Sequence, residues 1–97
     1  MAADSPDLAL LKANLGYTAG TTPAEVVLLL KNDLAAARQD LLRIGIGIVD
    51  TDAADLNLLV MYAAWLYRKR VTGEGRPPML QIIINDRKVA KATGADA

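Results

Sequence analysis

The segment from Leu56 to Val71 is apolar on almost every face of the helix that it predicts. Apolar residues recur along it at steps of three and four, and the run LLVMYAAWLY (residues 58–67) leaves almost no polar surface between them. A helix of this kind is buried on several sides, so it lies either at the centre of a bundle or in an interface between subunits. Asp50, Asp52 and Asp55 mark its start, and the bases at 68–70 followed by Gly73 mark its end.

This apolar run is too short to cross a membrane. It holds ten residues, whereas a spanning helix needs about 20. The N-terminal sequence MAADSPD is acidic, unlike a secretory signal or a transit peptide. We therefore expect a protein that is made in a cytoplasm and has no membrane contact.

Two further helices are predicted upstream. The sequence TPAE at residues 22–25 is typical of a capping box with Pro at the first helical position, and apolar residues from Val26 to Ile44 follow at helical spacing. A shorter helix begins at Ser5-Pro6-Asp7, where Ser5 is a candidate cap, and it ends before Gly16.

The remaining segments are less regular. Residues 44–49 alternate apolar residues with glycine, which favours an extended connector at 45–51 over a strand. A turn-rich hinge at 73–78 precedes residues 79–90, whose three consecutive isoleucines favour a strand by propensity although their pattern also fits a helix. Residues 92–97 are expected to form a disordered tail.

The composition removes most catalytic chemistry. The chain contains neither cysteine nor histidine, which excludes disulfides, Cys/His zinc sites, thiol nucleophiles and histidine bases. The carboxylates of Asp50, Asp52 and Asp55 superficially resemble a calcium loop, but they lack its glycine and its distant glutamate, so helix capping explains them better. We expect no enzymatic activity, no catalytic residue, no metal and no cofactor.

The charges are divided between the two halves of a neutral chain. Residues 1–55 hold eight acidic and four basic side chains, and residues 56–97 hold three acidic and seven basic ones. Two interpretations are open. The acidic and basic side chains lie on separate solvated faces, or the basic part of the subunit meets an acidic neighbour or DNA. Tyr62, Trp65 and Tyr67 lie within the apolar run, so we interpret them as core or interface anchors rather than a base-stacking platform.

Residues 55–70, with the pattern DxxLLVxYAAWLYRxR, resemble the signature helix of the tailed-bacteriophage head–tail connector proteins. These are also called head-completion, adaptor or DNA-packaging proteins. Pro78-Met79-Leu80 and Asn85-x-Arg87 are similar to the closing segment of that family, and the upstream segments occur in the same order. The resemblance covers residues 6–88.

The resemblance implies a small α-helical protein that assembles as a ring, usually of twelve subunits, beneath the portal protein in the neck of the virion. Such a ring extends the DNA channel, helps to retain the packaged genome and provides the attachment surface for the next tail-proximal protein. It also implies that residues 79–90 are helical. The expected fold is a single all-α domain over 1–97, with helices at about 6–15, 23–44, 53–71 and 79–90.

Two groups of residues are candidates for contacts in such a ring. A channel through which DNA slides should not bind it tightly, so double-stranded DNA is expected to pass without sequence recognition. Most of the Lys and Arg side chains are then expected to pair with carboxylates of neighbouring subunits. The candidates for the subunit or portal interface are Asp55, Tyr62, Trp65, Arg68, Arg70 and Arg87. The candidates for contacts with the DNA channel or a neighbour are Lys69, Arg76 and Lys88.

Two other classes of protein remain open. A small DNA-binding module, similar to a transcriptional regulator, would read a groove with residues 79–91. The neutral net charge and the consecutive isoleucines count against it, because a recognition helix carries polar side chains. The other is a helical partner-binding protein that forms no ring, such as an antitoxin-like subunit.

Overall fold

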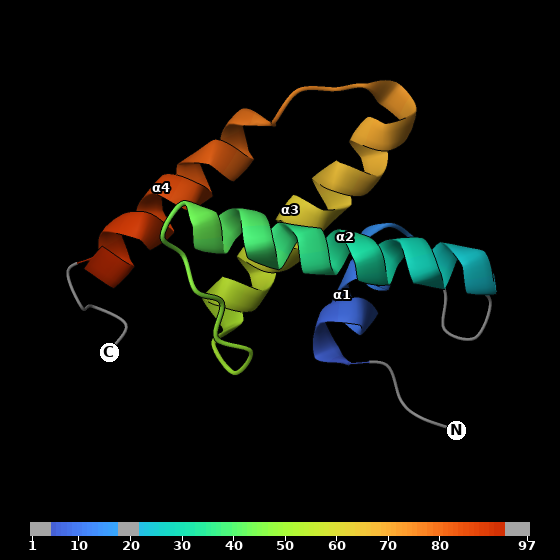
Figure 1. Ribbon diagram of the computed structural model, residues 1–97, viewed down its shortest axis with the longest axis horizontal. Helices are drawn as coiled ribbons and strands as arrows, with labels where there is room; N and C mark the ends of the chain where they lie inside the picture. Colours follow the sequence, from blue (N-terminus) through green and yellow to red (C-terminus); the bar gives the residue numbers. More distant parts are fainter. Residues whose placement is uncertain (1–4, 18–21, 93–97) are drawn as a thin grey trace.

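The computed structural model describes residues 5–17 and 22–92, which form four helices (Figure 1). These are α1 (Pro6–Asn14), α2 (Ala24–Arg43), α3 (Ala53–Thr72) and α4 (Pro78–Ala92). No strand occurs in these two stretches. The all-α prediction is confirmed, and each helix begins and ends within two residues of its predicted bounds.

Helix α3 lies at the centre, and α1, α2 and α4 each pack against it (Figure 1). Its residues Leu58, Leu59 and Ala63 are fully buried, in one core with residues such as Leu11 and Leu30. Of the two predicted positions for this helix, the bundle centre is therefore the one observed. Three helices of the same chain cover α3, so its apolar surface by itself requires no second subunit.

The predicted ends of α3 are confirmed. The carboxylate of Asp52 occupies the N-cap and accepts hydrogen bonds from the backbone N–H groups of Ala54, at 2.9 Å, and Asp55, at 3.2 Å. At the other end Gly73 adopts a left-handed conformation with φ of 69°, which a residue with a side chain rarely takes.

The predicted cap of α2 is wrong, whereas at α1 Ser5 takes the predicted N-cap position but its side chain makes no capping hydrogen bond. Pro23 takes the N-cap position of α2, and the helix has no side-chain cap. Thr22 therefore lies one residue too early to cap, and its buried hydroxyl has no hydrogen-bond partner among residues 5–17 and 22–92. In α1 the hydroxyl of Ser5 donates to Asp7 instead of capping, and the Asp7 carboxylate accepts the backbone N–H of Leu8 at 2.8 Å.

The helical interpretation of the C-terminal segment is confirmed, and the strand alternative is wrong. Among the described helices, only α3 packs against α4. Leu80 and Ile84 are buried in this contact, whereas Ile82 on the other side is 54% exposed. The predicted tail began one residue too early, because Ala92 belongs to α4; the other tail residues, 93–97, lie outside the described part.

The connector between α2 and α3 contains a core residue. Ile46 is fully buried, and residues 46–49 form neither helix nor strand, as predicted. The protein is flat, with extents of 42 × 33 × 19 Å. Helix α2 crosses in front of α3, and α4 runs along one side (Figure 1). This arrangement leaves the outer faces of α2 and α4 without cover from the described chain.

Candidate functional site

A buried carboxylate at the start of α3 holds the C-terminal half of α4. Asp55 is fully buried. Its Oδ1 accepts hydrogen bonds from Nε and Nη2 of Arg87, at 3.2 and 2.9 Å, and its Oδ2 accepts from Nζ of Lys91 and the backbone N–H of Val49, both at 2.9 Å. We call these four residues the Asp55 cluster; it joins α3, α4 and the connector.

The Asp55 cluster stabilises the charged form of its carboxyl group. Burial raises the pKa of Asp55, but the hydrogen bonds from Lys91, the Val49 N–H and Arg87 outweigh burial and leave this pKa below its usual value. Both basic partners are themselves largely buried, with side chains 14% (Arg87) and 19% (Lys91) exposed. Solvent therefore screens these ion pairs little.

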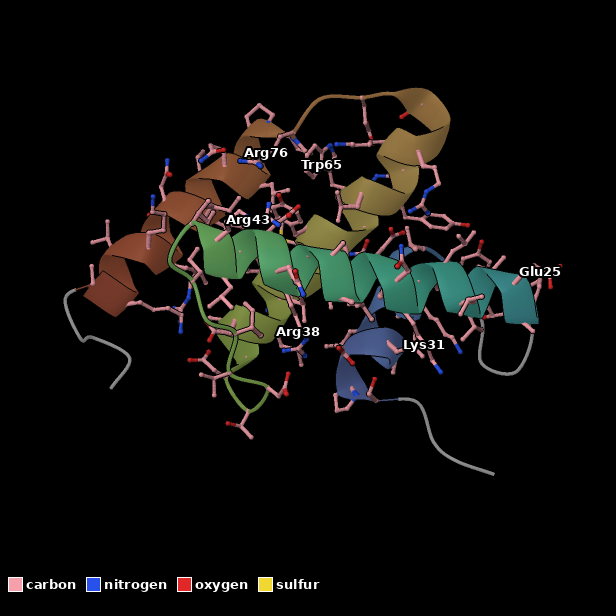
Figure 2. The ribbon with its side chains drawn as sticks, in the orientation of Figure 1. Glu25, Lys31, Arg38, Arg43, Trp65 and Arg76 are labelled. Atoms are coloured by element: carbon pink, nitrogen blue, oxygen red, sulfur yellow. The ribbon has the colours of Figure 1, made fainter. Side chains whose placement is uncertain are left out.

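A second cluster attaches the hinge at residues 73–77 to α3. The indole Nε1 of Trp65 donates to the backbone carbonyls of Gly75, at 3.0 Å, and Glu74, at 3.3 Å. The guanidinium carbon of Arg76 lies 5.3 Å from the centre of the Trp65 ring and 5.4 Å from that of Tyr62, within the range of cation–π attraction. Figure 2 shows Trp65 and Arg76 together near the start of α4.

Tyr62 completes this second group, the Trp65 cluster, which consists of Tyr62, Trp65, Arg76 and the two hinge carbonyls. The two aromatic rings meet edge to face with centres 5.4 Å apart. The hydroxyl of Tyr62 donates to Asp40 and accepts from Arg76, both at 3.2 Å. Burial and the nearby charge of Asp40 raise the pKa of Tyr62. The cluster thus links α2, α3 and the hinge.

A third contact joins α2 to the end of α3. Arg70 donates two hydrogen bonds to the carboxylate of Asp33, at 2.6 and 3.2 Å, and Asp33 is 2% exposed. Beside this pair the hydroxyls of Tyr67 and Tyr17 lie 3.0 Å apart, and their hydrogen bond raises the pKa of Tyr67. The two hydrogen bonds from the Arg70 guanidinium to the Asp33 carboxylate fix the position of α2 relative to α3.

The opposite charges of the two halves of the sequence meet inside the chain. Asp33 pairs with Arg70, and Asp55 pairs with Arg87 and Lys91. The expectation that Arg70 and Arg87 face carboxylates of a neighbouring subunit is therefore not needed to explain their charges. Their partners were missed because sequence spacing does not reveal ion pairs between residues more than 30 positions apart.

The other predicted site residues lie at or near the hinge or on α4. Arg68 forms an ion pair with Glu74 at 3.2 Å, and Nζ of Lys69 lies 4.6 Å from the centre of the Trp65 ring. Lys88 is exposed, and no partner is recorded for it among the described residues. Asp55, Tyr62 and Trp65 are core residues, so in this structure they are not available to a neighbour.

Part of the exposed surface is apolar. On the outer side of α4, Met79 is 60%, Ile82 54% and Val89 63% exposed. Their spacing places them along one face, which we call the α4 stripe. Sequence reasoning followed the opposite face of this helix, which packs on α3, and so missed it.

In the described residues no three acidic side chains come together as a metal site, and no described helix has the length and hydropathy of a membrane span. No protein-family model, curated protein or solved structure matches the chain.

Proposed function

We propose that this protein is a structural subunit of a bacteriophage head–tail connector ring. In this proposal it is made in the bacterial cytoplasm and assembles beneath the portal protein. It does not recognise the sequence of the DNA that passes through. The ring extends the channel, helps to retain the packaged genome and receives the next tail-proximal protein. The proposal begins from the resemblance of residues 55–70 and 78–87 to that family.

One observation carries the proposal: the two separate parts of this resemblance meet in space. Asp55, the first residue of the signature pattern, pairs with Arg87, the last residue of the closing segment, at 2.9 Å. Trp65 and Arg70 within the pattern also bind other parts of the chain. Asp55, Trp65 and Arg87 therefore act together in setting the position of α4 on α3, while Arg70 attaches α3 to α2. These internal roles of the motif residues support a shared architecture.

The α4 stripe is the surface that we assign to ring contacts. A cyclic ring is built from heterologous contacts, in which two different surfaces of the subunit meet. Met79, Ile82 and Val89 are held outward because the opposite face of α4 is fixed by Leu80, Ile84 and the Asp55 cluster. In this proposal a neighbouring subunit or the portal covers the stripe.

The pairing of the bases agrees with a channel that does not grip DNA. Arg70 and Arg87 are bound to buried carboxylates, so the charges of these two residues are already neutralised within the chain and are not free for phosphate contacts. The exposed side of α4 counts against the DNA-reader alternative, since Met79, Ile82 and Val89 place apolar side chains among its polar ones, whereas a base-reading face is mainly polar.

The test is electron microscopy of the protein mixed with purified portal. We expect rings coaxial with the portal, and we expect Ile82→Asp to abolish them because it places a charge in the stripe. Ala53→Asp is the matched control: Ala53 is exposed in the first turn of α3, where an acidic side chain is tolerated. Failure of the wild-type protein to join the portal contradicts the proposal, and strongly salt-dependent duplex binding supports a DNA-binding module instead.

A further inference from the structure

Helix α2 carries a second regular face that points away from the core. Leu28, Asn32, Ala35, Gln39 and Leu42 follow one another at alternating steps of four and three, and all five are exposed. We call this face the α2 seam. Leu28 is 69% and Leu42 65% exposed. Steps of this kind are typical of a helix that packs along its length against another helix.

The α2 seam is symmetric about its middle residue. From Ala35 toward either end it presents an amide side chain and then a leucine. Two copies of α2 that cross antiparallel at Ala35 therefore place Leu28 of each against Leu42 of the other. Such self-complementarity is the requirement for an isologous, two-fold contact, and the small side chain of Ala35 allows the two backbones to approach.

The charges at the ends of α2 fit the same arrangement. Glu25 and Arg43 lie at opposite ends of the helix (Figure 2), so an antiparallel pairing brings Glu25 of one copy to Arg43 of the other. No ion pair is recorded for Glu25 within the described chain, and the side chain of Arg43 is 71% exposed, paired with Asp40 alone. Glu25 is therefore available for the new contact, and the exposed guanidinium of Arg43 can meet it while it keeps its contact with Asp40.

The polar and apolar groups of the seam also lack partners. Neither Asn32 nor Gln39 has a recorded side-chain hydrogen bond among the described residues, so their amides can pair with each other across the two-fold axis. Beside Leu42 lies an open depression of about 380 Å³ lined by Arg38, Gln39, Leu42 and Arg43. In the antiparallel arrangement Leu28 of the second copy enters this depression.

We propose that the α2 seam binds the α2 seam of a second copy of this chain, as an antiparallel two-fold dimer of the free protein. This contact is separate from the α4 stripe. A cyclic ring cannot repeat an isologous contact between all its neighbours, so the dimer is a state outside the ring. One helix pair is a small interface, and the dimer should therefore depend on protein concentration.

Sedimentation equilibrium over a range of concentrations tests the dimer without portal. We expect the wild-type protein to pass from monomer to dimer, and Ala35→Arg to stay monomeric because its two arginines face each other at the axis. Ala13→Arg, which adds the same side chain at an exposed position of α1, should dimerise like the wild type. Circular dichroism checks that each variant is folded.

A charge exchange tests the antiparallel orientation. Glu25→Arg and Arg43→Glu should each raise the dissociation constant about tenfold, since each places like charges together. An equimolar mixture of the two variants should dimerise again, because both end contacts of the mixed dimer then join opposite charges. Weakening of each single variant together with recovery in the mixture identifies the antiparallel orientation. In a parallel pairing equivalent residues face each other, so neither single variant should weaken the dimer.

Three outcomes overturn the inference. They are a wild-type protein that stays monomeric up to about 1 mM, where even weak association is populated, dimers that persist in Ala35→Arg, and mixtures that show no rescue. Assembly into larger species without a dimer stage also counts against it, because this would mean that the seam meets a different surface. None of these results depends on whether the protein binds a portal.

Discussion

The Asp55 cluster and the Trp65 cluster both attach α4 to α3, but they use different interactions. The Asp55 cluster holds the far half of α4 through a fully buried carboxylate and two basic side chains. The Trp65 cluster holds the hinge before α4 through aromatic packing and hydrogen bonds to backbone carbonyls. The first attachment therefore depends mainly on buried ion pairs, and the second mainly on aromatic packing and hydrogen bonds to the backbone.

This difference indicates how each attachment fails. A buried charge that loses its partner is costly, because the remaining ions cannot recover their hydration. A buried ring that is removed leaves a cavity, and its cost depends on how far the surroundings collapse. The exposed hinge beside Trp65 can relax more readily than the packed ends of α3 and α4 around Asp55.

The largest effect is expected from Asp55→Ala. It leaves Arg87 and Lys91 together without their shared carboxylate, which should lower the free energy of unfolding by about 4 kcal/mol. Urea denaturation measures this loss. Asp52→Ala is the comparison: it removes the N-cap of α3 and a longer ion pair with Arg87, at 3.5 Å, and should cost only about 1 kcal/mol. Equal losses in the two variants would mean that the ion pairs of Asp55 stabilise the fold no more than an ordinary helix cap does.

Trp65→Ala should have the next largest effect. Loss of the indole from the core should lower the free energy of unfolding by about 3 kcal/mol, at the lower end of the range for tryptophan because the hinge can collapse toward it. Trp65→Phe keeps most of the packing and loses only the hydrogen bonds to the hinge, so it should cost about 1 kcal/mol. If Trp65→Ala reduced assembly and left monomer stability unchanged, Trp65 would belong to an interface.

The smallest effect, and the one that separates the two clusters best, is expected from acid. Because the pKa of Asp55 is lowered in the folded protein, its carboxylate stabilises the fold above its unfolded pKa, and this contribution is lost as pH falls below about 4. Trp65→Phe should keep this acid sensitivity, and Asp55→Asn should reduce it. Thermal unfolding between neutral and acidic pH compares them; identical pH profiles for all three proteins would contradict the assignment to Asp55.

Local sequence signals predict the helices because caps and apolar spacing act within a few residues. Asp52 and Gly73 bound α3 as expected, since each acts on the backbone beside it. The capping box of α2 failed because Pro23 displaced Thr22 from the cap position. The isoleucines of α4 adopt a helix because one side of it packs on α3, and this tertiary contact overrides their propensity for strands.

The site could be predicted only in part. Asp55, Trp65 and Arg87 were singled out by the sequence, but their partners inside the chain follow from how α3 and α4 cross, which no local spacing contains. Asp33 lies off the main apolar stripe of α2, yet it is 2% exposed and binds Arg70 of α3, whose side chain remains 43% exposed. The exposed seam of α2 was hidden because the core-facing stripe of the same helix dominates its pattern.

The single-sided packing of α4 has a consequence for how the protein opens. Since α3 alone among the described helices supports α4, detaching α4 exposes one interface and leaves the packing of α1, α2 and α3 on each other in place. The chain therefore contains a partial unfolding unit, made of α4 with its hinge, whose opening free energy lies below that of the whole domain. A protease that requires a locally melted segment would find it first at this end of the molecule.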